Sequence, residues 1–144
     1  MINRLILVFI SFIALSSLAH AQKADDILGT WLTDEGKARI EVYKENGKYN
    51  GKIVWLKEPK NEDGSLKRDK ENPEEELRDR PIVGLNLIKG FVFDDDQWED
   101  GEIYDPESGK TYSCRIKMKK GKLEVRGYIG APMFGRTVVW SRYK

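Results

Sequence analysis

Apolar and polar residues alternate in short runs along most of the chain after residue 26. Alternation with a period of two places successive side chains on opposite faces of a strand, and these runs are rich in aromatic and β-branched residues. No window keeps helical periodicity over three turns. We therefore predict an all-β protein with eight strands, near residues 28–33, 37–45, 48–57, 82–93, 98–104, 110–118, 122–129 and 136–142.

Two tight turns fix a register for the strands that flank them. Asn46-Gly47 suits a type I′ turn, because Asn and Gly tolerate positive φ, and Lys120-Gly121 is the second turn. Counting from the first turn pairs Val42 with Gly51, Ile40 with Ile53 and Ala38 with Trp55 on an apolar face, and Glu41 with Lys52 on the other. Counting from the second pairs Met118 with Leu123, Ile116 with Val125 and Cys114 with Gly127, with Lys117 opposite Glu124 and Arg115 opposite Arg126.

The alternating pattern stops between Glu58 and Arg80, where 15 of 23 residues are charged. This segment is expected to be a solvated crossing. Within it, Asn72 as N-cap and Pro73 at the first helical position predict one or two helical turns through Arg78. Asp69, Asn72 and Arg80 are also candidates for a polar cluster at one barrel mouth, although capping and loop packing explain the same residues.

Eight short antiparallel strands can close into an up-and-down barrel, which leaves no unpaired edge and encloses space for about one small ligand. A β-sandwich is the alternative. Gly29-Thr30-Trp31, together with Arg142 in the last strand, resembles lipocalin-like barrels, in which the tryptophan closes one end and the arginine packs over it.

The chain as a whole resembles a family of small exported bacterial proteins, domain of unknown function 2147. The resemblance rests on segments spread from Gly29 to Trp140. The segments that carry it include Ala38-Arg39-Ile40-Glu41-Val42-Tyr43, Gly51-Lys52-Ile53-Val54-Trp55, Arg80-Pro81-Ile82-Val83-Gly84-Leu85, Tyr104-Asp105-Pro106 and Val125-Arg126-Gly127-Tyr128-Ile129-Gly130. It implies an envelope protein with a calycin-like β-barrel, and it brings no catalytic residue with it.

The first 21 residues have the pattern of an export signal. Arg4 precedes an apolar run over residues 5–15, and Ala19-His20-Ala21 places small residues where a signal peptidase cleaves. We predict a signal peptide over residues 1–21, a single domain over 22–144, and a periplasmic or secreted protein. A transmembrane anchor is the alternative interpretation of residues 1–21. It fits the pattern less well, because the apolar run is shorter than the roughly 20 residues that span a bilayer.

Charge and histidine content exclude several classes of function. Arg4 is the only charged residue before Lys23, so the remaining chain carries 24 basic and 24 acidic residues, unlike a nucleic-acid-binding protein. The single histidine, His20, lies in the signal, which removes histidine-based catalysis and zinc sites. We expect no cofactor and no metal. The acidic run over residues 94–96, followed by Glu99 and Asp100, lacks EF-hand spacing and is predicted to be a solvated turn, with a calcium site as the alternative.

Five residues are candidates for ligand binding, each with a structural alternative. The register directs Trp55 and Tyr112 into the barrel, where core and ligand site coincide, and directs Tyr128 outward. Arg126 and Arg136 flank a glycine-containing loop, where they could hold a carboxylate or phosphate or else form surface ion pairs. Cys114 points inward and is interpreted as a buried structural thiol rather than a reactive one.

Three functions remain open. The first is a binding barrel for a small apolar or amphipathic molecule, and the second is an interaction module of the cell envelope whose barrel is filled by side chains. The third is a hydrolase that uses carboxylates. Small inward residues such as Ala38, Gly51 and Gly127 would favour a void and hence the first function, whereas many large inward side chains would favour the second.

Overall fold

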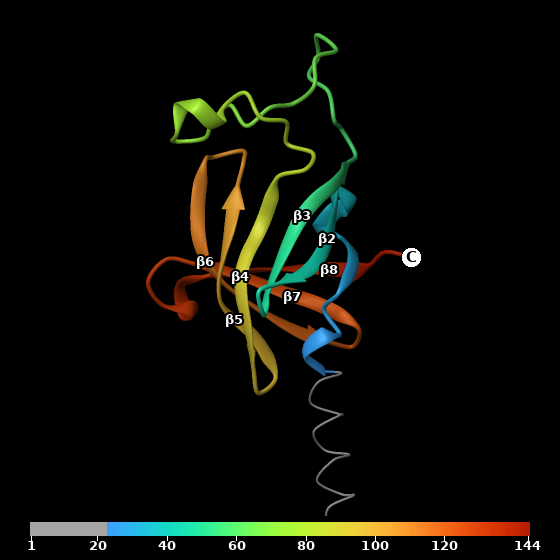
Figure 1. Ribbon diagram of the computed structural model, residues 1–144, viewed down its shortest axis with the longest axis vertical. Helices are drawn as coiled ribbons and strands as arrows, with labels where there is room; N and C mark the ends of the chain where they lie inside the picture. Colours follow the sequence, from blue (N-terminus) through green and yellow to red (C-terminus); the bar gives the residue numbers. More distant parts are fainter. Residues whose placement is uncertain (1–22) are drawn as a thin grey trace, which may run out of the picture.

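Eight antiparallel strands close into a barrel in the computed structural model, which describes residues 23–144 (Figure 1). Each strand pairs with the next along the chain, and the last pairs with the first. The strands are β1 (Gly29–Leu32), β2 (Ala38–Glu45), β3 (Lys48–Leu56), β4 (Asn86–Asp94), β5 (Gln97–Asp105), β6 (Lys110–Lys119), β7 (Lys122–Tyr128) and β8 (Arg136–Arg142). The prediction of an all-β, eight-stranded up-and-down barrel is confirmed, and the sandwich alternative is wrong.

Seven of the eight predicted strands begin and end within one residue of the observed bounds. The exception is β4, which starts at Asn86 and not at residue 82. Gly84 adopts φ 99°, a conformation that glycine tolerates and that interrupts an extended strand. Ile82 and Leu85, on either side of it, are buried in the core. Residues 82–85, the start of the apolar run predicted as a strand, therefore belong to the end of the crossing, which Ile82 and Leu85 anchor in the core.

Both predicted turns are present, with positive φ at Asn46, Gly47, Lys120 and Gly121. The register predicted for β6 and β7 is confirmed at every pair, including Cys114 opposite Gly127 and Arg115 opposite Arg126. In the first hairpin, the predicted pairs of Val42 with Gly51, Glu41 with Lys52 and Ile40 with Ile53 are confirmed as well.

The predicted pairing of Trp55 with Ala38 is wrong. A β-bulge lies between Arg39 and Ile40, so that Trp55 faces Arg39 and Ala38 faces Leu56. An extra residue in one strand reverses the faces of all residues beyond it, because side chains alternate with a period of two. Trp55 is half-buried and stacks on the Arg39 guanidinium, 4.1 Å from its carbon to the ring centroid, while Leu56 packs against the core.

Large side chains fill the inside of the barrel. Trp31, Phe91, Trp98 and Trp140 are all at most 2% exposed. Two inward glycines are filled by their neighbours: a Cβ at Gly51 would lie 2.7 Å from Ile88 Cγ1, and the Phe91 ring occupies the place of a Gly101 side chain. The expectation that small inward residues open a void is therefore wrong at Gly51.

The N-terminal segment closes one end of the barrel. The Trp31 indole donates to the Ile27 carbonyl at 2.9 Å, and the Arg142 guanidinium stacks over the same indole at 4.0 Å. Arg142 also donates to the carbonyls of Leu28 and Asp26 at 2.6 and 2.7 Å. The predicted roles of Trp31 and Arg142 are confirmed.

The crossing is longer than the predicted segment 58–80 and comprises residues 57–85, which connect β3 to β4. It lies over the other end of the barrel, at the top of Figure 1. The predicted helix is reduced to a single 3₁₀ turn, η2 (Glu75–Leu77), and Asn72 is not its N-cap. The Asn72 side-chain oxygen instead accepts a hydrogen bond from the Glu74 backbone N–H at 2.9 Å, a local turn that competes with helix initiation.

The predicted signal peptide, residues 1–21, lies outside the described residues. Among residues 23–144, no helix has the length and apolar character needed to cross a membrane.

Candidate functional site

A groove of about 1080 Å³ lies at the end of the barrel that the crossing covers. The crossing forms one side, and the loop before β2, the end of β3 and the turn between β5 and β6 complete it. These segments all lie at the same end of the barrel. The groove is therefore located at the mouth of the barrel. Apolar side chains from three of these segments line it, namely Leu56, Leu66, Ile82 and Pro106.

Charged side chains of both signs surround these apolar residues. The basic ones are Lys37, Lys57, Lys67, Arg68, Lys70 and Arg78, and the acidic ones are Glu35, Glu58, Glu71, Asp79 and Glu107. The Lys37 ammonium pairs with Glu35 at 3.1 Å, which raises the lysine pKa, and the Glu107 carboxylate adds to this effect from the β5–β6 turn. An apolar floor with a charged rim suits an amphipathic molecule.

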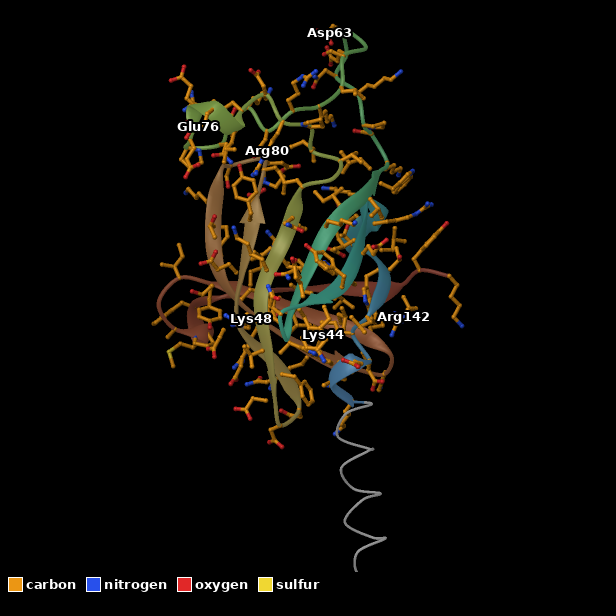
Figure 2. All side chains as sticks on the ribbon, in the orientation of Figure 1. Lys44, Lys48, Asp63, Glu76, Arg80 and Arg142 are labelled. Atoms are coloured by element: carbon orange, nitrogen blue, oxygen red, sulfur yellow. The ribbon has the colours of Figure 1, made fainter. Side chains whose placement is uncertain are left out.

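A buried polar cluster holds the crossing in place beside this groove. Asp69 is fully buried, and its carboxylate accepts three hydrogen bonds: from the Tyr104 hydroxyl at 2.6 Å, the Asn72 amide at 2.8 Å and the Arg80 guanidinium at 2.8 Å. Tyr104 belongs to β5, so the cluster joins the crossing to the barrel wall. The cluster proposed from the sequence is present, and Figure 2 shows Arg80 in the lower part of the crossing, above the strands.

The Asp69 carboxylate is fully engaged by these donors, and its role is structural. Burial, followed by the hydrogen bond to Asp69, raises the pKa of Tyr104 to about 12, so the hydroxyl remains a donor across the neutral range. Gly109, with φ 73°, adds a second contact, because its Cα packs against the Glu71 carbonyl and leaves no space for a side chain. The crossing is thus fastened to both β5 and the β5–β6 turn, although most of its side chains are solvated.

The candidate residues predicted from the sequence do not form one site. Trp55 lies on the outer face with Arg39, whose guanidinium is stacked between Trp55 and Tyr143. Tyr112 has the inward register of Cys114 and Ile116 and is half-buried opposite Ile103. Neither residue lines the mouth groove.

Arg126 and Arg136 lie on opposite faces of the sheet. Arg126 pairs with Thr137 on the outer face, whereas Arg136 pairs with the inward-facing Gly127 and is exposed. Tyr128 is on the outer face, as predicted, opposite Ser113. The two arginines therefore do not form the joint anion site considered from the sequence.

Cys114 is 1% exposed, and burial raises the pKa of its thiol to about 12. The prediction that Cys114 is buried is confirmed. The acidic run over residues 94–96 is an exposed turn between β4 and β5, with Asp95 at φ 59°.

We expect the Cys114 thiol of the native protein to resist alkylation at mildly alkaline pH and to react fully in denaturant, since the thiolate is the reactive form. Mass spectrometry after exposure to iodoacetamide with and without urea measures this. Rapid labelling of the native protein would contradict the placement of Cys114.

The mouth groove was not predicted from the sequence. Its apolar residues Leu56, Leu66 and Pro106 are isolated in charged or turn segments, where no periodicity marks them. The loop between Arg126 and Arg136 was singled out for its glycines, but its apolar character was not. Ile129, Met133 and Phe134 do carry a signal there, because polar residues are usual in loops.

Comparison with known proteins agrees with the barrel architecture. A search of curated proteins found no match. Among solved structures, the chain is similar to "Protein HP1028 from the human pathogen Helicobacter pylori belongs to the lipocalin family", with a TM-score of 0.71, 27% sequence identity, and coverage of 82% of this chain and 83% of that one. The family DUF2147, described as "Uncharacterized protein conserved in bacteria", matches residues 29–142. The chain therefore belongs to the DUF2147 family and has a lipocalin-like barrel.

Proposed function

We propose that this protein is exported to the bacterial cell envelope and binds a small amphipathic molecule in the groove at its barrel mouth. The observation that carries the proposal is the groove itself, about 1080 Å³ with an apolar floor that reaches the core residue Ile82. Export is supported by the pattern of residues 1–21. Similarity to a protein described as a lipocalin supports a binding role.

The mouth is favoured over the barrel interior for a steric reason. Ile40 and Ile88 pack into the place of a side chain at Gly51, and Phe91 does the same at Gly101. A ligand inside this part of the barrel would have to displace close-packed side chains, which is costly in a core of normal density. At the mouth, an apolar tail can instead cover Leu56 and Leu66 while its polar head meets the rim.

A dansyl-labelled fatty acid is a suitable probe, because it combines an apolar tail with a carboxylate. We expect saturable binding with a rise in dansyl fluorescence. Leu66 is 51% exposed, so Leu66→Ser leaves the core intact while it removes part of the groove floor. We expect this variant to weaken binding by about fivefold to tenfold.

The matched control is Val92→Ser, which removes another exposed apolar side chain, on β4 and outside the groove. Its affinity is expected to equal that of the unmodified protein. No saturable binding, or equal losses in both variants, would contradict the mouth as the site.

The filled interior also favours a second candidate, an interaction module that binds another macromolecule and no small ligand. This function predicts that the protein, purified from its own host, retains no small molecule in native mass spectrometry. A retained amphipathic molecule would exclude this candidate and support the first.

A further inference from the structure

A loop of exposed apolar side chains lies beside a basic strip on the outer wall of the barrel. The loop follows β7 and includes the 3₁₀ turn η3 (Pro132–Phe134). Three of its side chains are among the most exposed large apolar residues of the described chain: Ile129 at 71%, Met133 at 77% and Phe134 at 77%. In Figure 1 this loop projects from the left side of the barrel, apart from the crossing at the top. We call residues 129–134 the apolar loop.

The apolar loop is held in an exposed conformation. The Arg126 guanidinium donates to the Pro132 carbonyl at 2.6 Å and to the Thr137 hydroxyl at 2.8 Å, which ties the loop to β7 and β8. Within the loop, the Phe134 and Gly135 N–H groups donate to Ala131 and Pro132 at 3.1 Å. The fold therefore presents Met133 and Phe134 to solvent in a fixed geometry and does not let them collapse onto the barrel.

Positive charge lines the outer face of β6 and β7, the hairpin that leads into this loop, and Arg126 lies nearest to it. The outward positions of β6 and β7 hold five basic side chains and one acidic side chain, Glu124. The basic strip consists of Arg115, Lys117, Lys119, Lys122 and Arg126. A groove of about 490 Å³ joins the strip to the loop and is lined by Arg115, Lys117, Arg126 and Met133, among others. This excess is local, because residues 23–144 carry equal numbers of basic and acidic side chains.

We infer that the apolar loop and the basic strip form a docking surface for an anionic phospholipid bilayer. Exposed large apolar side chains with adjacent Lys and Arg match a bilayer interface, in which acyl chains lie beneath a layer of phosphate groups. The loop enters the interface with Met133 and Phe134, and the strip contacts headgroup phosphates. This peripheral docking goes beyond the proposed function and uses none of the groove residues at the barrel mouth.

The test is co-flotation of the purified protein with vesicles that contain phosphatidylglycerol, compared with vesicles of phosphatidylcholine alone. We expect binding to the anionic vesicles, and we expect salt to weaken it, since salt screens the attraction of the strip. Phe134→Ser should reduce the partition coefficient roughly tenfold, because one exposed phenyl ring no longer transfers from water to the interface. Lys117→Glu should reduce it by about tenfold for anionic vesicles only.

Leu66→Ser is the matched control, because it removes an exposed apolar side chain at the barrel mouth. It should leave vesicle binding unchanged, and Phe134→Ser should leave binding of the dansyl-labelled fatty acid unchanged. The two proposals can thus fail separately. Far-UV circular dichroism verifies that each variant folds.

Three outcomes would overturn the inference. The first is the absence of binding to anionic vesicles at low salt, and the second is binding that Phe134→Ser leaves intact. The third is self-association of the protein without lipid that Phe134→Ser abolishes in analytical ultracentrifugation. That result would assign the apolar loop to an interface between copies of the chain.

Discussion

Asp69→Ala is expected to lower the free energy of unfolding by about 3 kcal/mol or more. The carboxylate is fully buried and accepts hydrogen bonds from three side chains. Two of these donors, Tyr104 and Asn72, are themselves buried. Its removal leaves both without an acceptor, and such orphaned groups cost about 1–3 kcal/mol each. Arg80 contributes less to the loss, because its side chain is 39% exposed and water can solvate it.

Urea unfolding followed by tryptophan fluorescence measures this effect. Asp79→Ala is the matched control, since Asp79 is an exposed aspartate in the same crossing, and its effect should stay within about 0.5 kcal/mol. A double-mutant cycle between Asp69→Ala and Tyr104→Phe should show coupling, because the two side chains share one hydrogen bond. Equal stabilities of the Asp69 and Asp79 variants would show that the buried cluster does not fasten the crossing.

Trp31→Ala is expected to destabilise the fold by about 3–5 kcal/mol. Trp31 is fully buried, donates to the Ile27 carbonyl and carries the Arg142 guanidinium on its ring. Alanine would leave a cavity at the closed end of the barrel and an unpaired Ile27 carbonyl. Arg142 would also lose the surface on which it stacks.

Trp55→Ala is the matched comparison for this tryptophan. Trp55 lies outside the barrel against Arg39, so its loss removes a cation–π contact and partial burial, about 1–2 kcal/mol in all. Thermal unfolding followed by far-UV circular dichroism avoids the loss of a fluorophore in either variant. Equal effects of the two substitutions would support the uninterrupted register, with Trp55 inside, and contradict the bulge.

The strand register could be predicted from the sequence where tight turns set it, but not at Trp55. Asn46-Gly47 and Lys120-Gly121 specify turn geometry locally, and the alternation of the flanking residues then fixes which side chains share a face. The register of β6 and β7 follows completely from these local rules. The same rules fail at Trp55, because a bulge adds one residue and nothing in the local pattern requires it.

Contacts between distant segments were less accessible from the sequence. Asp69 and Tyr104 are 35 residues apart, and their hydrogen bond exists because the crossing folds back over β5. The isolated leucines and proline of the mouth groove likewise acquire a shared surface only through the placement of three loops. Arg126 and Arg136 were candidates for a joint anion site because they flank one loop, but the pleat of the sheet separates them onto opposite faces.

The sequence by itself determined the strand count, the turn positions and the all-β class, because each depends on local conformational preference or on period-two alternation. The roles of Trp31 and Arg142 at the closed end followed from the resemblance to lipocalin-like barrels. Only the tertiary structure decided whether the barrel is filled, where the crossing is anchored and which exposed side chains lie together. These features depend on the volumes and polar partners that meet when strands and loops distant in sequence pack together.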